Sequence, residues 1–265
     1  MHLHLRGEIG RRSFLKSLGV GLLFSQTAYA NGNSKEVYLT IDDGPSPNMR
    51  KILDTIDEYP GNYLTFFLLG ENLHDETLYR MAREAIVKGH VVGNHTYSHR
   101  LASKTSYERF IGEIKATTNM IEDLYSHTGV GNPKLFRFPY GDKGGKKNAK
   151  AIRKFLDENG YTDYFWDGDT LDWKYYSGNR SLEKVLDEVR NAKQGEVVLT
   201  HDFYRKGKVS TPVEAIKVLV DEGYCLRTLE GKRKFETEVE DPLPELKITI
   251  ERRGKVTIEG PEPAI

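Results

Sequence analysis

The stretch Thr40-Ile41-Asp42-Asp43-Gly44-Pro45 decides how the rest of the chain is interpreted. It ends an alternating apolar run, residues 37–41, that is typical of a β-strand, and the Gly-Pro pair cannot continue the strand. Two adjacent carboxylates are therefore left at a strand end. Successive side chains on a strand point to opposite faces, so Asp42 and Asp43 are expected to do different jobs unless the chain bends sharply there. One could hold a metal ion while the other handles a proton.

Two histidines offer the nitrogen ligands that a metal site needs. His95 and His99 stand four residues apart in the run HTYSH, and one turn of helix would place both imidazoles on one face. Together with one aspartate they make three protein ligands, which leave a zinc-like ion one open position for water, as in catalytic sites. Taken alone the H-x-x-x-H pattern is weak evidence, because such pairs occur by chance on many helices.

A strand–helix rhythm runs through most of the chain. Strands are predicted at residues 37–41, 64–69, 91–93, 135–138, 163–166, 197–200 and 224–228. Helices are predicted after a cap at Ser46 and at residues 76–88, 106–127, 148–159, 181–191 and 212–222. About seven strands alternating with six helices indicate an α/β fold with a parallel sheet or barrel. The chemically active side chains then fall near strand C-terminal ends, where such barrels collect their catalytic residues.

Five motifs occur in a fixed order along the chain. They are TIDDGP at 40–45, HTYSH at 95–99, RFPYG at 137–141, DTLDW at 169–173 and LTH at 199–201. On these motifs the chain resembles the polysaccharide deacetylase family, also called the NodB-homology domain or carbohydrate esterase family 4, and is similar to bacterial peptidoglycan and chitooligosaccharide N-deacetylases. The resemblance covers roughly residues 35–230 and departs from the family pattern at Ile41, where Phe is usual. It implies a distorted (β/α) barrel with about seven parallel strands.

The resemblance implies a metal site and a catalytic base. Asp43, His95 and His99 correspond to the residues that bind a divalent metal, most often zinc, with cobalt, nickel or manganese as other possibilities. Asp42 corresponds to the general base, and Arg137 to the arginine that orients this base through a charge-assisted hydrogen bond. The metal would acidify a water and polarise the acetyl carbonyl group.

The later motifs correspond to an acid and a substrate pocket. The resemblance gives His201 the role of general acid for the leaving amine, with Asp169 holding its imidazole in the working tautomer. Tyr140 would contribute its backbone N–H to an oxyanion hole and contact the substrate. Trp173 and Leu199 would line the pocket for the acetyl methyl group, although both are equally well explained as core residues.

The two ends of the chain differ from the middle. Residues 1–30 are predicted to be a twin-arginine-type signal peptide, with the pair Arg11-Arg12, a short apolar stretch and a cleavage site after Ala30. The apolar stretch is too short to span a bilayer, so the protein is expected to be exported, periplasmic or secreted, without a stable membrane anchor after cleavage. Residues 35–231 are assigned to the deacetylase-like domain, and 232–265 to a C-terminal appendage with a possible small hairpin.

Composition limits the classes of molecule that this protein is expected to bind. The 265 residues carry 39 basic and 39 acidic side chains, so the formal net charge is zero. The sequence has no basic stripe, and nucleic acid is therefore not expected as a partner. The expected function is metal-dependent removal of N-acetyl groups from N-acetylhexosamines of a cell-wall or extracellular polysaccharide, peptidoglycan first and chitin oligosaccharides second, with release of acetate. The alternatives are an O-acetyl ester hydrolase acting on a glycan such as xylan, a noncatalytic carbohydrate-binding protein, and a metal-dependent phosphodiesterase, which usually needs ligands for two metals. No obligate protein partner is implied.

Overall fold

The computed structural model describes residues 35–145, 148–230, 247–250 and 256–259. The predicted signal peptide, residues 1–30, and most of the predicted appendage, residues 232–265, lie outside the described residues. In the part that is described, no helix combines the length and the apolar character needed to cross a membrane.

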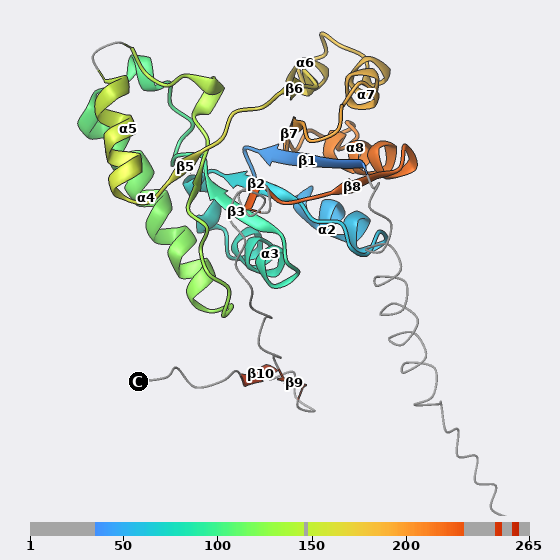
Figure 1. The fold of residues 1–265 in the computed structure, drawn as a ribbon, viewed down its shortest axis with the longest axis horizontal. Coiled ribbons are helices and arrows are strands. Elements are labelled where there is room, and N and C mark those ends of the chain that lie inside the picture. The colour runs from blue at the N-terminus through green and yellow to red at the C-terminus, as the bar shows by residue number, and fades with distance from the viewer. Residues whose placement is uncertain (1–34, 146–147, 231–246, 251–255, 260–265) are drawn as a thin grey trace, which may run out of the picture.

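The core of the fold is one parallel sheet. Seven strands follow each other in the order β5-β4-β3-β2-β1-β7-β6, and β8 pairs with the start of β1. The strands are β1 (Lys35–Asp42), β2 (Thr65–Leu68), β3 (Val91–Asn94), β4 (Leu135–Phe136), β5 (Thr162–Asp163), β6 (Gly168–Asp169), β7 (Val197–His201) and β8 (Tyr224–Leu226). Every pair along this path is parallel, and the sheet curls into a half-barrel (Figure 1). The predicted α/β class with a distorted (β/α) barrel is confirmed.

Helices surround the curled sheet in an order that follows the strands. They are α2 (Met49–Asp57), α3 (Glu76–Val87), α4 (Tyr107–Ser126), α5 (Ala149–Glu158), α6 (Asp172–Tyr176), α7 (Leu182–Arg190) and α8 (Thr211–Asp221), with 3-10 turns η1 (Gly70–His74), η2 (Ala102–Lys104) and η3 (Pro139–Gly141). Neighbouring helices contact each other in the sequence α5, α4, α3, α2, α8, α7, α6, and Figure 1 shows them on the outside of the strands. This arrangement is what parallel strands joined by helical crossovers produce.

The central strand β1 lies in the core and stabilises the sheet through its apolar contacts. Its last six residues are all buried, because β2 and β7 flank it and helices cover the outer face. Ile52, Leu53 and Ile56 of α2 and the apolar face of α8 belong to the same core cluster as Leu39 and Ile41 of β1. The carboxyl end of this buried strand carries Asp42, so the core fixes that carboxylate in space.

Two local predictions were wrong. Ser46 does not cap the first helix, which begins at Met49 after Asn48; instead its hydroxyl donates to Asp202. His95 and His99 do not lie on a helix, because β3 ends at Asn94 and the next residues form a loop. Outside the main sheet, β9 (Lys247–Ile250) and β10 (Val256–Glu259) pair antiparallel, at the position of the possible hairpin.

Candidate active site

Strand register assembles the site at the carboxyl edge of the sheet. Asp42 ends β1 and is the register partner of His201, the last residue of β7. Asp169 ends β6 and is paired with Leu199, which stands two residues before His201 on β7. Arg137 follows β4 directly. Residues far apart in the sequence therefore meet, because parallel strands present their carboxyl ends on one side.

Backbone strain is concentrated at this edge. In the described part of the chain, five of the six non-glycine residues with positive φ belong to the motifs, namely Asp43 (68°), Thr96 (69°), His99 (56°), Tyr140 (58°) and Leu171 (55°). Such conformations cost about 1–3 kcal/mol each and persist only where the surroundings impose them. The bend at Asp43 explains why two consecutive strand-end carboxylates both approach His95, although alternation along a strand would separate them.

Three side chains converge as a candidate metal centre. Asp43 Oδ1 lies 3.3 Å from His95 Nε2 and 3.2 Å from His99 Nε2. One ligand atom from each of the three residues lies within 4.8 Å of the others. The loop reaches this arrangement through the positive φ angles of Thr96 and His99 and not through a helical turn.

The chemistry of these donors fits a divalent cation. Asp43 Oδ1 is buried and accepts no hydrogen bond from any described residue, which is costly unless a cation or donor occupies the centre. His95 Nδ1 lies 2.8 Å from the Arg137 carbonyl oxygen, so it donates there and leaves the Nε2 lone pair for a metal. Burial lowers the pKa of His99 to about 4, which keeps its imidazole neutral at pH 7 and able to act as a ligand.

Charge balance in the centre also favours a dication. Among the described residues the aspartates Asp42, Asp43, Asp172 and Asp202 are buried, whereas Arg137 is the one buried lysine or arginine. A divalent cation held by Asp43, His95 and His99 would offset this excess of buried acidic groups, because buried charge without a partner is strongly unfavourable.

Arg137 contacts Asp42 across the inside of the curled sheet. It is fully buried, and its Nη1 donates to Asp42 Oδ1 at 2.8 Å and to Thr40 Oγ1 at 2.7 Å. Thr40 and Asp42 are two residues apart on β1 and therefore share a face. The guanidinium also lies over the Phe67 ring, 4.2 Å from its centroid. The predicted contact between Arg137 and Asp42 is thus present, and curling of the sheet is what lets one side chain bridge β4 and β1.

The residue that holds His201 is not the predicted one. His201 Nδ1 lies 2.6 Å from Asp172 Oδ1, and Asp172 Oδ2 also accepts the His201 backbone N–H at 2.8 Å. Asp169, to which this role was assigned, accepts the Leu171 backbone N–H with its Oδ1 and closes the turn after β6. The left-handed conformation of Leu171 turns the chain there, so that Asp172 begins α6 facing the end of β7.

The DTLDW motif contains two aspartates, and the role of holding His201 was assigned to the first of them. Asp172 is the second, three residues after Asp169, and only the turn between them decides which one reaches His201. Asp172 is fully buried and accepts a third hydrogen bond, from Thr211 Oγ1 at 2.6 Å. Sequence reasoning also missed Phe203, whose ring stacks on His201 with centroids 5.2 Å apart and an interplanar angle of 3°.

The ionisation of His201 follows from these neighbours. Burial by itself lowers the pKa of the imidazole, but the charge and hydrogen bond of Asp172 outweigh burial and raise the pKa to about 9. At neutral pH this histidine is a proton donor. The pKa of Asp43 shifts the other way: burial would raise it, but the adjacent His95 holds it well below its usual range.

These groups face a cavity of about 430 Å³, called here the catalytic cavity. Its lining includes Asp42, Asp43, His95, His99 and His201 together with the predicted substrate contacts Tyr140, Trp173 and Leu199, and also Asp169. The Tyr140 and Trp173 side chains are largely exposed, whereas Leu199 is buried. Gly141 and Asp142 donate their backbone N–H groups to Phe138 and Pro139, while no described residue accepts the Tyr140 N–H. That amide is therefore available to a bound oxyanion.

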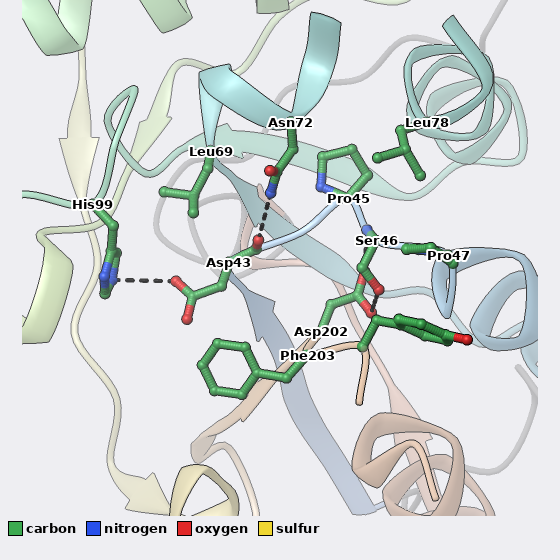
Figure 2. Close-up of a pocket in the computed structure, with 11 residues that line it drawn as sticks. Asp43, Pro45, Ser46, Pro47, Leu69, Asn72, Leu78, His99, Asp202 and Phe203 are labelled. Atoms are coloured by element: carbon green, nitrogen blue, oxygen red, sulfur yellow. Dashed lines mark hydrogen bonds and ion pairs between the residues drawn. The ribbon is translucent and has the colours of Figure 1, made fainter. Parts of the chain in front are cut away.

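A second set of contacts fixes the loop that carries Asp43. Figure 2 shows Asn72 and His99 on either side of Asp43: Asn72 Nδ2 donates to the Asp43 carbonyl oxygen at 3.0 Å. Ser46 donates its backbone N–H and its hydroxyl to the Asp202 carboxylate, at 2.8 and 2.7 Å (Figure 2). Burial raises the pKa of Asp202 to about 6, against the lowering effect of these hydrogen bonds. The strand ends β1 and β7 are thus joined beyond the sheet itself.

A protein-family model described as polysaccharide deacetylase matches residues 29–163. Among curated proteins, the peptidoglycan-N-acetylmuramic acid deacetylase PdaC of Bacillus subtilis is 36% identical over 201 residues, which cover 74% of this chain and 38% of that protein. A peptidoglycan-N-acetylglucosamine deacetylase of Bacillus cereus is 34% identical over 212 residues, 78% of this chain and 71% of that protein. Among solved structures, the peptidoglycan deacetylase PdaC from Bacillus subtilis superposes with a TM-score of 0.63 at 31% identity, covering 78% of this chain and 94% of that one.

Proposed function

This chain belongs to the polysaccharide deacetylase family, and from that premise we propose that it is a metal-dependent hydrolase that removes N-acetyl groups from N-acetylhexosamine residues of peptidoglycan. Chitin oligosaccharides are the second candidate substrate. The observation that carries the proposal is the convergence of Asp43, His95 and His99 on one point, with Asp42 and His201 lining the same cavity. A base, an acid and a metal centre around one cavity are the parts that amide hydrolysis needs.

Asp43, His95 and His99 would hold a divalent cation, and a donor set of two imidazoles and one carboxylate favours zinc. When bound, the cation would acidify a water molecule and polarise the acetyl carbonyl group. Asp42 would accept the proton of the attacking water. The guanidinium of Arg137 holds this carboxylate in place: it donates to Asp42 Oδ1 at 2.8 Å, while Asp42 Oδ2 lies 3.6 Å from His95 Nε2.

His201 would act at the second stage of the reaction. Its imidazolium would donate a proton to the leaving amine, so that the C–N bond breaks with release of a neutral amine and not of an amide anion. Asp172 accepts from Nδ1 and so leaves Nε2 as the nitrogen that donates. Stacking against Phe203 restricts rotation of the ring. Tyr140 would donate its backbone N–H to the developing oxyanion, and Asp169 would support the wall of the cavity and not the imidazole.

The names of relatives support peptidoglycan as the substrate class, and the cavity lining supports an acetyl group as the part that is removed. The relatives in Bacillus subtilis and Bacillus cereus carry names that specify deacetylation of N-acetylmuramic acid and of N-acetylglucosamine in peptidoglycan. Trp173 and Leu199 form apolar lining in the catalytic cavity, which suits the methyl of an acetyl group. The site could also hydrolyse an acetyl ester, because the same base, acid and cation serve both reactions.

Acetate release tests the proposal. The protein would be incubated with zinc or cobalt and with peptidoglycan, chitopentaose or acetylated xylan, and Asp42→Asn would be the matched control because it keeps the shape of the side chain and removes the base. We expect release from peptidoglycan, less from chitopentaose, and loss of both in the variant and in the presence of a chelator. Release from xylan alone would reassign the protein as an ester hydrolase. Absence of release from all three with metal bound would favour a carbohydrate-binding role.

Export through a signal at residues 1–30 is part of the proposal, because peptidoglycan lies outside the cytoplasm. Replacing Arg11 and Arg12 by lysine should retain the protein in the cell, since folded-state export depends on the arginine pair. Fractionation of cells that express the wild-type and double-variant chains measures this. Equal export of the two chains would refute the twin-arginine assignment.

A further inference from the structure

A second cavity of about 350 Å³ adjoins the catalytic cavity; we call it the side cavity (Figure 2). The two cavities share Asp43, His99 and Phe203 in their linings. A ligand that extends from one to the other must therefore pass the metal-site pair Asp43 and His99. The volume of the side cavity is at the lower end of the about 300–1,000 Å³ that small-molecule sites occupy, which suits a single sugar ring.

The lining of the side cavity has the two kinds of surface that sugars bind. Pro45, Pro47, Leu69 and Leu78 provide apolar contact, and Tyr204 adds an aromatic ring that is 62% exposed. The C–H face of a pyranose ring is apolar and slightly positive, so it packs on the negative face of an aromatic ring. The Tyr204 loop is anchored, because Asn48 Nδ2 donates to the Phe203 carbonyl oxygen at 2.7 Å.

Polar groups in the side cavity still have acceptor capacity. Asp202 is only 2% exposed, and each of its carboxylate oxygens accepts one hydrogen bond, both from Ser46. An ionised carboxylate offers about four acceptor positions, so about two remain. No lysine or arginine pairs with Asp202 among the described residues. Hydroxyl groups of a neutral sugar would satisfy the remaining positions.

We propose that the side cavity is a glycan subsite, in which Tyr204 and Asp202 bind the sugar next to the one whose acetyl group enters the catalytic cavity. This inference rests on the proposed function. It specifies that the glycan chain extends from the catalytic cavity past Asp43 and His99 into the side cavity. Phe165 is a comparable aromatic residue, 49% exposed, and it stacks on Trp166, which lines the catalytic cavity but not the side cavity. Phe165 therefore serves as the matched control for direction.

Chain-length dependence tests the assignment. The kcat and KM for acetate release would be measured with N-acetylglucosamine, its dimer and its pentamer, using the wild-type protein, Tyr204→Ala, Tyr204→Phe and Phe165→Ala. Loss of one aromatic stacking contact lowers kcat/KM for the pentamer by about two- to tenfold. We expect this loss in Tyr204→Ala, mainly through KM, with the monosaccharide unchanged. Tyr204→Phe keeps the ring and should retain pentamer activity.

Three outcomes would overturn the subsite. In the first, Tyr204→Ala matches the wild type with every substrate. In the second, Tyr204→Ala loses activity equally with monosaccharide and pentamer, which would mean that Tyr204 acts through the neighbouring His201. In the third, Phe165→Ala loses pentamer activity as strongly as Tyr204→Ala. Lack of acetate release by the wild-type protein from any acetylated glycan is a separate result, because it refutes the proposed function itself.

Discussion

The contact between Asp172 and His201 gives the sharpest prediction. The difference between the ordinary His pKa of 6.5 and the value of about 9 in this site corresponds to about 3 kcal/mol in favour of the imidazolium. At pH 7, about 99% of His201 is then protonated, against roughly a quarter at the ordinary value. The alkaline limb of the activity profile therefore reports loss of this proton, and activity falls as pH rises.

Asp172→Asn should remove the negative charge beside His201 and the acceptor that keeps the proton on His201 Nδ1. Asp172 Oδ2 accepts from the His201 backbone and from Thr211 Oγ1, so the Asn carbonyl oxygen takes that place. The Asn amide group then faces His201 Nδ1 and donates to it, which stabilises the neutral imidazole. The pKa of His201 should fall from about 9 toward or below 6.5, and kcat should fall by about 10²–10⁴, the usual contribution of a general acid.

NMR titration of the His201 ring in the metal-free protein measures the pKa directly, and a pH–rate profile with metal bound measures its consequence. A bound dication repels the imidazolium, so the alkaline limb should lie below 9 in the loaded protein. Asp169→Asn is the matched control, since it changes the other aspartate of the same motif, and His201 should still titrate near 9. The reasoning is refuted if His201 titrates near 9 in Asp172→Asn, or if Asp169→Asn lowers its pKa equally.

Three further predictions concern the metal centre and the buried charges. Asp43→Ala should lower the affinity for zinc by more than about 10–100-fold, the loss seen when a residue that only hydrogen-bonds to a metal ligand is removed. Competition with a chelator measures this affinity, and an unchanged affinity would exclude Asp43 as a ligand. Arg137→Met should lower the free energy of unfolding by about 3–5 kcal/mol, because it leaves buried Asp42 without its cation. Urea denaturation measures the free energy of unfolding of this variant and of the control Arg153→Met. The control removes the ion pair of Arg153 with Asp163 at the surface and should cost under about 1 kcal/mol. Equal losses of stability in the two variants would contradict the argument. Burial raises the pKa of Asp202 to about 6 from an ordinary 3.8, so ionisation destabilises the fold as pH rises through that range. Metal-free Asp202→Asn should therefore be more stable than the wild type at pH 7, by up to about 3 kcal/mol, and lose that advantage at pH 4; a constant difference in melting temperature between these pH values would count against it.

The class of fold and most members of the site could be predicted from the order of the amino acids alone. Apolar runs separated by amphipathic segments are local patterns, and they predicted the strand at residues 37–41 that the fold buries between β2 and β7. Asp42, Asp43 and the pair His95 and His99 were found from their residue types and spacing. The other site residues were found through the resemblance of the five motifs to the family, and a parallel sheet gathers strand ends on one edge. Position along the chain was enough to predict that Asp42 and His201 would lie at the carboxyl edge of the sheet, where they are register partners.

The partner of His201 and the way the metal-site histidines converge could not be predicted before the chain was seen folded. The choice between Asp169 and Asp172 depends on one left-handed residue, Leu171, and no pattern in the sequence specifies that angle. The two metal-site histidines converge through loop geometry where a helical turn was expected, because positive φ angles are imposed by packing and not by residue preference. The side cavity likewise arises where the loops after β1 and β7 meet. Contacts between loops depend on the distances between strand ends, and those distances exist only once the sheet has curled.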